Sequence, residues 1–509
     1  MFLAFETFNW VPVLMLFPLA FNAAVRSARS TWEAFRIGFL TSLVIMLGGF
    51  YWVTYVIHEF GGIPWSVSGL LFLGFCGFGA LNFPVFAALS YFFNQRSHSA
   101  NASRSHILLW YSIGTPALFT LIEWAIPKLF PWYIGHALYR QLWAIQICEF
   151  TGASLLTFII YSIGSTLDYL LQKHPAHVKP MKRALLIPGG LILLQITIGF
   201  WCLKHRSFAL SAPLKVALIQ ANIGNLDKVQ AKQGSLSRVD TVLSTYAELS
   251  REALIQKPDL IVWPETAIPL RMDIPSPRQF EILNLVKEFN IPLISGGYGS
   301  HSANPNREHN SAFLLDPSEG SLRTETYHKN ILLAFGEYLP LGETFPVLYR
   351  MFPQVSDFAR GHEQKAFTLS NGIRLGISIC YEAIVPSFMR KVAQQQVQAL
   401  VNLTNDSWFG PTSEPYLHGA LTVFRSVEHR LPQVRVTNTG ASFTVDHLGQ
   451  MSNRSEIYRP EALIQSISPR AAATLTTYGE WGDWFIAVLG ILLSFLIFNT
   501  WRNRASVSV

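Results

Sequence analysis

Apolar residues are concentrated in long blocks along this chain, and most of the polar residues lie in one stretch between the last two blocks. The blocks have 18 or more residues, the length at which a helix can cross a bilayer with all its backbone groups paired. They predict seven spans, near residues 7–25, 34–57, 68–93, 106–126, 148–170, 183–203 and 484–501. We therefore expect a transmembrane helical domain over residues 1–205 with about six spans, and a last transmembrane helix with its tail over 482–509.

The pattern changes between residues 206 and 481, where short β-branched runs alternate with helical stretches. This alternation is typical of a layered α/β domain. One regular amphipathic helix is expected from about 238 to 256. Strands are expected at 215–220, 260–263, 293–296, 312–315, 374–379, 400–403, 433–437 and 442–445.

Composition supports a membrane protein, because 50% of the residues are hydrophobic and only 14% are charged. The net charge of +7 does not indicate a nucleic-acid partner, since no basic patch is interleaved with stacking aromatic residues. Lys and Arg are frequent in alternate loops between the spans, and such loops are retained in the cytoplasm. This places the polar stretch on the periplasmic side of a cell inner membrane.

Cysteine usage singles out one residue. Cys76, Cys148 and Cys202 fall in apolar spans, where a small buried hydrophobic residue is the ordinary role of cysteine. Cys380 stands alone in the polar domain, which makes its thiol a candidate nucleophile.

Three short motifs in the polar domain carry a carboxylate, an ammonium and a thiol. They are Trp263-Pro264-Glu265-Thr266, His328-Lys329-Asn330 with Phe335-Gly336-Glu337, and Ile379-Cys380-Tyr381-Glu382. A thiol needs a base to become a nucleophile, and the oxyanion formed by its attack needs a positive neighbour. Taken singly, Glu265 could be a solvated carboxylate and Lys329 an ordinary surface lysine. The hypothesis of one site therefore depends on the three motifs together.

These motifs resemble the nitrilase superfamily, and the spans around them resemble its membrane branch, the apolipoprotein N-acyltransferases. The resemblance extends over nearly the whole chain. It includes Phe60-Gly61-Gly62, Phe130-Pro131-Trp132 with Gly135, Arg360-Gly361, Asn405-Asp406-Ser407-Trp408-Phe409-Gly410 and Thr437-Asn438-Thr439-Gly440. It implies a multi-span α-helical membrane domain joined to a nitrilase-like α-β-β-α sandwich.

The resemblance also implies roles for individual residues. It makes Cys380 the nucleophile, Glu265 the general base and Lys329 the group that stabilises the tetrahedral oxyanion, with a lowered thiol pKa expected beside the lysine. The remaining residues that it implies are supporting or binding groups: Asn330, Glu337, Tyr381, Glu382, Trp408 and Phe409.

The implied reaction is acyl transfer from a membrane phospholipid, with phosphatidylethanolamine the expected donor, to the N-terminal diacylglyceryl-cysteine of apolipoproteins. A thioester on the cysteine would link its two halves in ping-pong order. No metal or other cofactor is expected, since His418 and His429 are 11 residues apart and no His-Glu-x-x-His motif occurs.

Other readings remain open at this point. A membrane-tethered amidase or hydrolase of the same superfamily would use the same triad, and a non-catalytic transporter or scaffold would not need it.

The chain also departs from the family pattern. One N-terminal span of the family has no counterpart among the predicted spans, and Lys228-Val229 stands where the family has Lys-Trp. Ala334 and Leu431 replace a usual proline and a common arginine. A divergent paralogue with another amine acceptor is therefore the alternative.

The stretch from Tyr338 to Phe358 is unusually apolar for a loop. We interpret it as a lid or interfacial arm over the site. An ordinary core segment explains the same composition equally well.

Overall fold

The computed structural model describes residues 2–6, 8–97, 104–172, 185–206, 208–224, 236–302, 304, 307–317, 322–352, 355–472 and 474–505. The chain forms two compact units, and each is described by itself. The first comprises residues 1–54, 65–206 and 481–509, and the second comprises residues 55–64 and 207–480.

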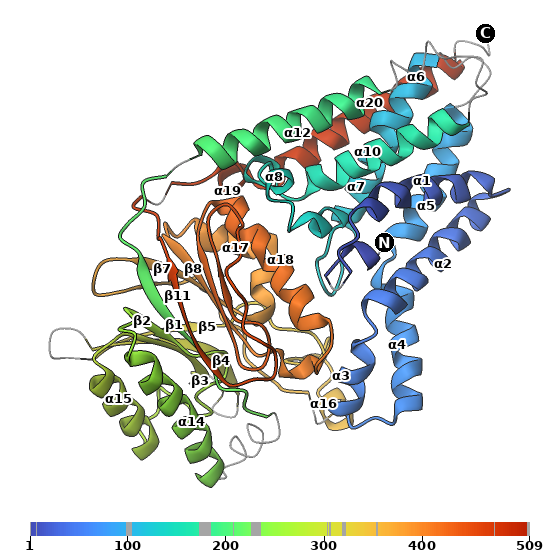
Figure 1. The fold of residues 1–509 in the computed structure, drawn as a ribbon. Coiled ribbons are helices and arrows are strands. Elements are labelled where there is room, and N and C mark those ends of the chain that lie inside the picture. The colour runs from blue at the N-terminus through green and yellow to red at the C-terminus, as the bar shows by residue number, and fades with distance from the viewer. Residues whose placement is uncertain are drawn as a thin grey trace. The chain divides into compact units, whose positions relative to one another are not determined.

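The first unit is helical (Figure 1). Its helices are α1 (Pro12–Ser27), α2 (Thr31–Gly49), α4 (Trp65–Gly79), α5 (Asn82–Ser97), α6 (Arg104–Leu109), α7 (Thr115–Ala125), α8 (Leu142–Ile145), α9 (Cys148–Thr151), α10 (Ser154–Leu171), α12 (Leu186–His205) and α20 (Trp484–Ala505). The short 3₁₀ helices η1 (Phe2–Ala4) and η3 (Ile134–Leu138) and the π-helix η2 (Trp110–Gly114) connect or extend them.

Six helical segments of the described part of the chain are long and apolar enough to cross a membrane. They are 31–49, 65–95, 105–125, 154–171, 186–205 and 484–502. The first predicted span instead forms the shorter helix α1, of 16 residues. The second predicted span ends early, because the helix is interrupted at residues 50–52. The next helix, α3 (Val53–Glu59), belongs mostly to the second unit.

A buried carboxylate fixes one loop of the first unit. Glu123 near the end of α7 accepts hydrogen bonds from the backbone N–H of Ile134 at 2.9 Å and from the hydroxyl of Thr157 at 2.8 Å. An unpaired carboxylate is costly inside an apolar bundle, and these donors compensate for it. Glu123 therefore ties the loop at Ile134 to α7 and α10.

The second unit contains two β-sheets (Figure 1). The six-stranded sheet has the order β11-β1-β2-β3-β4-β5, and the five-stranded sheet has the order β10-β9-β8-β7-β6. The strands are β1 (Leu214–Gln220), β2 (Leu260–Val262), β3 (Leu293–Ser300), β4 (Glu308–Asp316), β5 (Arg323–His328), β6 (Ala366–Thr368), β7 (Arg374–Ile379), β8 (Ala399–Thr404), β9 (Gln433–Thr437), β10 (Phe443–Val445) and β11 (Glu461–Ile467).

Helices cover the outer faces of these sheets. Helices α14 (Leu236–Leu254) and α15 (Pro277–Phe289) lie on the six-stranded sheet, and α17 (Pro386–Ala393) and α18 (Glu414–His429) lie beside the five-stranded one (Figure 1). One apolar core lies between the two sheets, and a second lies between the six-stranded sheet and its helices. The predicted α-β-β-α sandwich is confirmed. The short helices α16 (Val347–Met351) and α19 (Thr477–Trp481) complete the unit.

All eight predicted strands and the predicted long helix are present, and most of them have shifted ends. Three strands were not predicted. Strand β5, with the sequence Arg-Thr-Glu-Thr-Tyr-His, is polar and half exposed because it lies at a sheet edge. Strands β6 and β11 are also edge strands and lack a clear alternating pattern. Strand β6 has only three residues, too few to show one.

The departures from the family pattern have different outcomes. Leu431 is buried in the core between the sheets, where an apolar side chain is at home. Ala334 lies in the turn that pairs with Tyr338. Lys228 and Val229 lie outside the described residues.

The apolar stretch 338–358 is largely exposed rather than part of a core. Its described residues include the short helix α16, none of whose residues is buried. Leu341, Phe345 and Met351 are more than half exposed, whereas Leu339 and Phe358 at the two ends are buried. The exposed part is therefore an apolar arm anchored at both ends.

Candidate active site

Glu265 follows the end of β2 and is held there by its neighbours in sequence. Trp263 is fully buried, stacks on Tyr246 and donates its indole N–H to Ser250 at 2.9 Å. The next turn passes directly over β3, because a Cβ on Gly296 would lie 2.6 Å from the Cα of Glu265. Trp263 and Gly296 together fix where the carboxylate of Glu265 enters the site.

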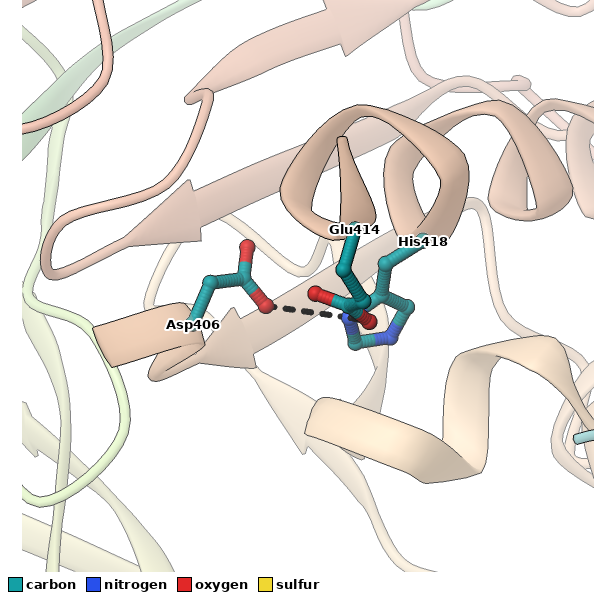
Figure 2. Close-up of side chains that lie close together, drawn as sticks. All are labelled: Asp406, Glu414 and His418. Atoms are coloured by element: carbon teal, nitrogen blue, oxygen red, sulfur yellow. Dashed lines mark hydrogen bonds and ion pairs between the residues drawn. The ribbon is translucent and has the colours of Figure 1, made fainter. Parts of the chain in front are cut away.

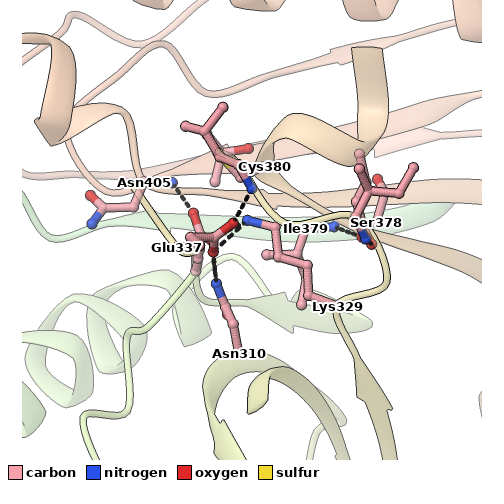
Figure 3. Close-up of polar contacts among 12 residues, drawn as sticks. Asn310, Lys329, Glu337, Ser378, Ile379, Cys380 and Asn405 are labelled. Atoms are coloured by element: carbon pink, nitrogen blue, oxygen red, sulfur yellow. Dashed lines mark hydrogen bonds and ion pairs between the residues drawn. The ribbon is translucent and has the colours of Figure 1, made fainter. Parts of the chain in front are cut away.

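Lys329 and Asn310 both point at the carboxylate of Glu337 (Figure 3), and the ammonium of Lys329 also pairs with Glu265. The ammonium of Lys329 lies 3.1 Å from Oε1 of Glu265 and 2.8 Å from Oε1 of Glu337. The amide of Asn310 donates to the same two carboxylates, at 2.7 and 2.8 Å. The second oxygen of Glu265 accepts from the backbone N–H of Asn405 at 2.9 Å. The amide of Asn310 and the backbone of Asn405 thus help to fix one ammonium and two carboxylates.

Cys380 begins the short helix η5 (Cys380–Ile384) directly after β7 and is 7% exposed. Its φ of 51° lies in the left-handed region. This conformation costs a residue with a side chain about 1–2 kcal/mol, and functional sites are where such strain is usually retained. The turn presents the thiol at the carboxyl end of a strand, where sites in α/β sheets commonly lie.

The charges of the cluster act on the thiol. Burial is the main reason why the pKa of Cys380 is raised well above its usual value, and the carboxylate of Glu265 raises it further, while Lys329 lowers it. Burial opposes the charge of Lys329, but Glu265 and Glu337 outweigh burial and raise its pKa well above the usual value. The expected lowering by the lysine is therefore present but outweighed. The resting site holds a thiol and an ammonium, so the thiol needs a base to react.

Glu382 joins the two segments that carry Lys329 and Cys380. Its carboxylate accepts from the backbone N–H groups of Asn330 at 2.6 Å, Ile331 at 3.0 Å and Ile379 at 2.8 Å. Tyr327 donates its hydroxyl to both oxygens at 2.8 Å. Burial raises the pKa of Glu382 to about 7, and the backbone hydrogen bonds oppose this rise.

The other predicted supporting residues have separate positions. The side chain of Asn330 donates to the Tyr327 hydroxyl at 3.0 Å and to two backbone carbonyls. Trp408 contacts the ring of Phe60 at 4.4 Å, and Phe409 is buried. Tyr381 is half-buried next to Cys380. Of this group, the structure places Asn330 in the polar network and the three aromatic residues at its margins.

A second buried cluster lies near the nucleophile turn, since α18 packs against η5. Asp406, Glu414 and His418 offer ligand atoms within 4.8 Å of one another, a spacing that a metal ion could bridge (Figure 2). Arg435 donates to Asp406 at 2.9 Å and is itself fully buried. A guanidinium already neutralises the carboxylate that would be the main metal ligand, so the donor set does not fit a divalent cation well.

Sequence reasoning missed Asn310 and Arg435. Both are polar residues within strands, and a polar residue at a position that the strand pattern buries is the signal that could have found them. From the sequence, His418 was considered only with His429 as a metal motif, and its buried neighbours Asp406 and Glu414 were not considered.

Comparison with known proteins gives two family matches. Residues 215–476 match the carbon-nitrogen hydrolase family, and residues 1–166 match the apolipoprotein N-acyltransferase N-terminal domain. Among solved structures, an amidase from Nesterenkonia sp. aligns with 17% identity and a TM-score of 0.37, covering 54% of this chain and 95% of that one.

Two curated relatives match over most of their length. The apolipoprotein N-acyltransferase of Bdellovibrio bacteriovorus is 33% identical, with 96% of this chain and 89% of the relative covered. That of Geobacter metallireducens is 32% identical, with 89% and 84% covered. The family predicted from the motifs is confirmed. This membrane protein is an acyltransferase and belongs to the apolipoprotein N-acyltransferase family.

Proposed function

We propose that this acyltransferase moves an acyl chain from a membrane phospholipid to the α-amine of the N-terminal diacylglyceryl-cysteine of apolipoproteins, through a thioester on Cys380. The observation that carries the proposal is the buried cluster in which Lys329 contacts Glu265 and Glu337 and acts electrostatically on the thiol. The three groups supply a base, an oxyanion partner and a nucleophile.

In the first half-reaction, the sulfur of Cys380 attacks the ester carbonyl of the phospholipid while Glu265 takes the thiol proton. The ammonium of Lys329 stabilises the oxyanion of the tetrahedral intermediate. The ester C–O bond then breaks, and Glu265 returns the proton to the departing hydroxyl of the lysophospholipid. Phosphatidylethanolamine is the proposed donor.

In the second half-reaction, the α-amine of the lipoprotein cysteine attacks the thioester carbonyl. Glu265 removes a proton from the amine, the C–S bond breaks, and the proton returns to the sulfur of Cys380. The product carries an amide-linked acyl chain. Glu337 and Glu382 hold Lys329 and the Cys380 turn in place throughout both halves.

We assign residues 1–205 and 482–509 to the cell inner membrane and residues 206–481 to a periplasmic catalytic domain. The exposed apolar arm within residues 338–358 supports a substrate that is embedded in lipid, since Phe345 and Met351 are apolar side chains that are more than half exposed. Replacing both Phe345 and Phe352 with Ser should reduce turnover of lipid-embedded substrate. Unchanged turnover would exclude a lid function.

The first test is mass spectrometry of the purified protein after incubation with phosphatidylethanolamine, with Cys380→Ala and Cys380→Ser as controls. An acyl mass on Cys380 that is discharged by a diacylglyceryl-cysteine peptide, with an amide-linked chain on the peptide, is the expected result. Discharge by water alone would indicate a hydrolase. The absence of any adduct on Cys380 would reject the thioester mechanism.

A further inference from the structure

The strained turn of Cys380 depends on what holds its backbone carbonyl. Cys380 is in the left-handed region although it carries a side chain. Such a conformation persists only where its surroundings specify it. The neighbouring strand β8 supplies the contact, because the amide of Asn402 donates to the carbonyl of Cys380 at 3.4 Å and to that of Ser378 at 3.3 Å. One side-chain amide therefore holds the carbonyls on both sides of Ile379.

Arg435 on β9 orients that amide. Its Nη1 donates to Oδ1 of Asn402 at 2.6 Å, and its Nη2 donates to Oδ2 of Asp406 at 2.9 Å. A hydrogen bond from a charged donor is shorter and stronger than one from a neutral donor. The guanidinium also polarises the Asn402 amide, which strengthens the hydrogen bonds that the amide donates. Because Oδ1 of Asn402 is engaged by Arg435, the NH₂ group of Asn402 must face Ser378 and Cys380.

The position of Arg435 is itself fixed. Asp406 accepts from Arg435 with one oxygen, and its other oxygen lies 3.0 Å from Nδ1 of His418 (Figure 2). The carboxylate packs against backbone, since a Cβ on Gly440 would lie 2.1 Å from Oδ2 of Asp406. Arg435, Asn402 and Asp406 are all at most 1% exposed. Neither solvent nor side-chain freedom competes with these contacts.

We propose that Arg435 is a positioning residue for acyl transfer, acting through Asn402 to hold the Cys380 turn in its reactive geometry. The proposal rests on the proposed function of Cys380 as nucleophile. Arg435 touches neither the thiol nor the Glu265 cluster in any contact of the described residues, so its effect on chemistry passes through the backbone. Asp406 is then the counterion of the guanidinium and His418 a hydrogen-bond partner of Asp406, rather than ligands of a metal ion.

The test compares two buried arginines that receive the same change. Arg435→Lys keeps the charge but loses the fork that reaches Asn402 and Asp406 together. Arg425→Lys is the matched control, because Arg425 is equally buried and its ion pair with Glu428, at 2.8 Å, lies within α18. The readouts on the full-length protein in detergent are the single-turnover rate of Cys380 acylation, its dependence on phosphatidylethanolamine concentration, and the thermal unfolding midpoint.

The expected result is an acylation rate about 10- to 100-fold lower per folded molecule for Arg435→Lys, as for a small misplacement of a reacting group. Half-saturation by lipid should stay unchanged, and Arg425→Lys should stay within about threefold of the unmodified protein. Equal rates for the two variants after correction for the folded fraction would overturn the proposal.

Asn402→Asp is a second variant that does not depend on the stability of Arg435→Lys. It has nearly the same shape and keeps a partner for Arg435, but it turns the donor that faces Cys380 and Ser378 into an acceptor. We expect a similar loss of acylation rate, and the double variant should lose less than the product of the two single losses. Full activity of Asn402→Asp, or a metal ion retained at one equivalent by the unmodified protein and lost on His418→Gln, would overturn the proposal. Acylation that survives Cys380→Ala would instead reject the proposed function itself.

Discussion

Two buried ion clusters within the second unit use similar groups in different ways. In the first, the ammonium of Lys329 lies between the carboxylates of Glu265 and Glu337 beside the Cys380 thiol. In the second, the guanidinium of Arg435 is shared between an amide and the carboxylate of Asp406. Both consist mostly of buried side chains, with Glu337 the most exposed at 14%, so burial alone does not distinguish a reactive cluster from a supporting one.

The difference lies in the charge balance. The first cluster has two carboxylates for one cation, so one carboxylate remains as a base for the thiol proton. In the second cluster, burial raises the pKa of Glu414 well above its usual value and lowers the pKa of His418, so burial favours the neutral form of both groups. Asp406 and Arg435 then balance each other. A cluster can do acid–base chemistry when it retains an unmatched base, and a balanced cluster holds structure.

The largest effect is expected from removing the cation of the first cluster. Lys329→Met should lower the rate of thioester formation about 100- to 1000-fold, the usual loss when one group that stabilises an oxyanion is removed. It also leaves the carboxylates of Glu265 and Glu337 facing each other. The measurement is acyl-enzyme mass against time, with the exposed lysine variant Lys287→Met as control. A rate within threefold of the unmodified protein would remove Lys329 from the mechanism.

A smaller effect is expected from restoring charge balance in the first cluster. Glu337→Gln leaves Glu265 as the only carboxylate paired with Lys329, which strengthens that ion pair and makes Glu265 a poorer base. Acylation should slow about 10- to 100-fold, because the ammonium also loses one of its two anchors. The rate should be measured per folded molecule. An unchanged rate would show that the excess charge has no role.

The sequence predicted the layered fold and the triad because both depend on local patterns. Apolar blocks define spans, alternating β-branched runs define the buried strands, and Glu265 and Cys380 each follow such a strand directly. Lys329 was predicted from its motif, although the strand β5 that precedes it was not predicted. An exposed edge strand has too few apolar residues to show the alternating pattern of a strand.

The contacts between segments distant in sequence could not be predicted in the same way. Asn310 bonds to residues 45 and 27 positions away, and Arg435 bonds to residues 33 and 29 positions away. Each pairing depends on the order of strands in a sheet, and hydrophobic periodicity carries no information about that order. A polar residue inside a strand shows that a partner is needed but not which one.

The next smaller effect is expected at Glu382. Its pKa of about 7 predicts a stability that depends on pH. This value lies above the ordinary carboxyl value of 4.5, so the folded protein binds the proton more tightly. The resulting stabilisation is full below about pH 4.5 and is lost as the pH rises through about 7, up to roughly a few kcal/mol. Unfolding midpoints measured between pH 5 and 8 should therefore fall with pH, and Glu382→Gln should flatten this slope. An equally steep slope in the variant would assign the dependence to another group.

The smallest effect is expected from the change at Glu414 that matches Glu337→Gln in the first cluster. Burial, followed by the neighbouring Asp406, raises the pKa of Glu414 well above its usual value, so its neutral form is favoured and charge balance predicts an uncharged carboxyl here. Glu414→Gln replaces one neutral group by another of nearly the same shape, so the acylation rate should stay within about threefold and stability within about 1 kcal/mol. A large loss of either would mean that Glu414 is ionised and that the second cluster also carries an unmatched base. The pair of Glu→Gln variants thus tests directly whether charge balance separates the reactive cluster from the supporting one.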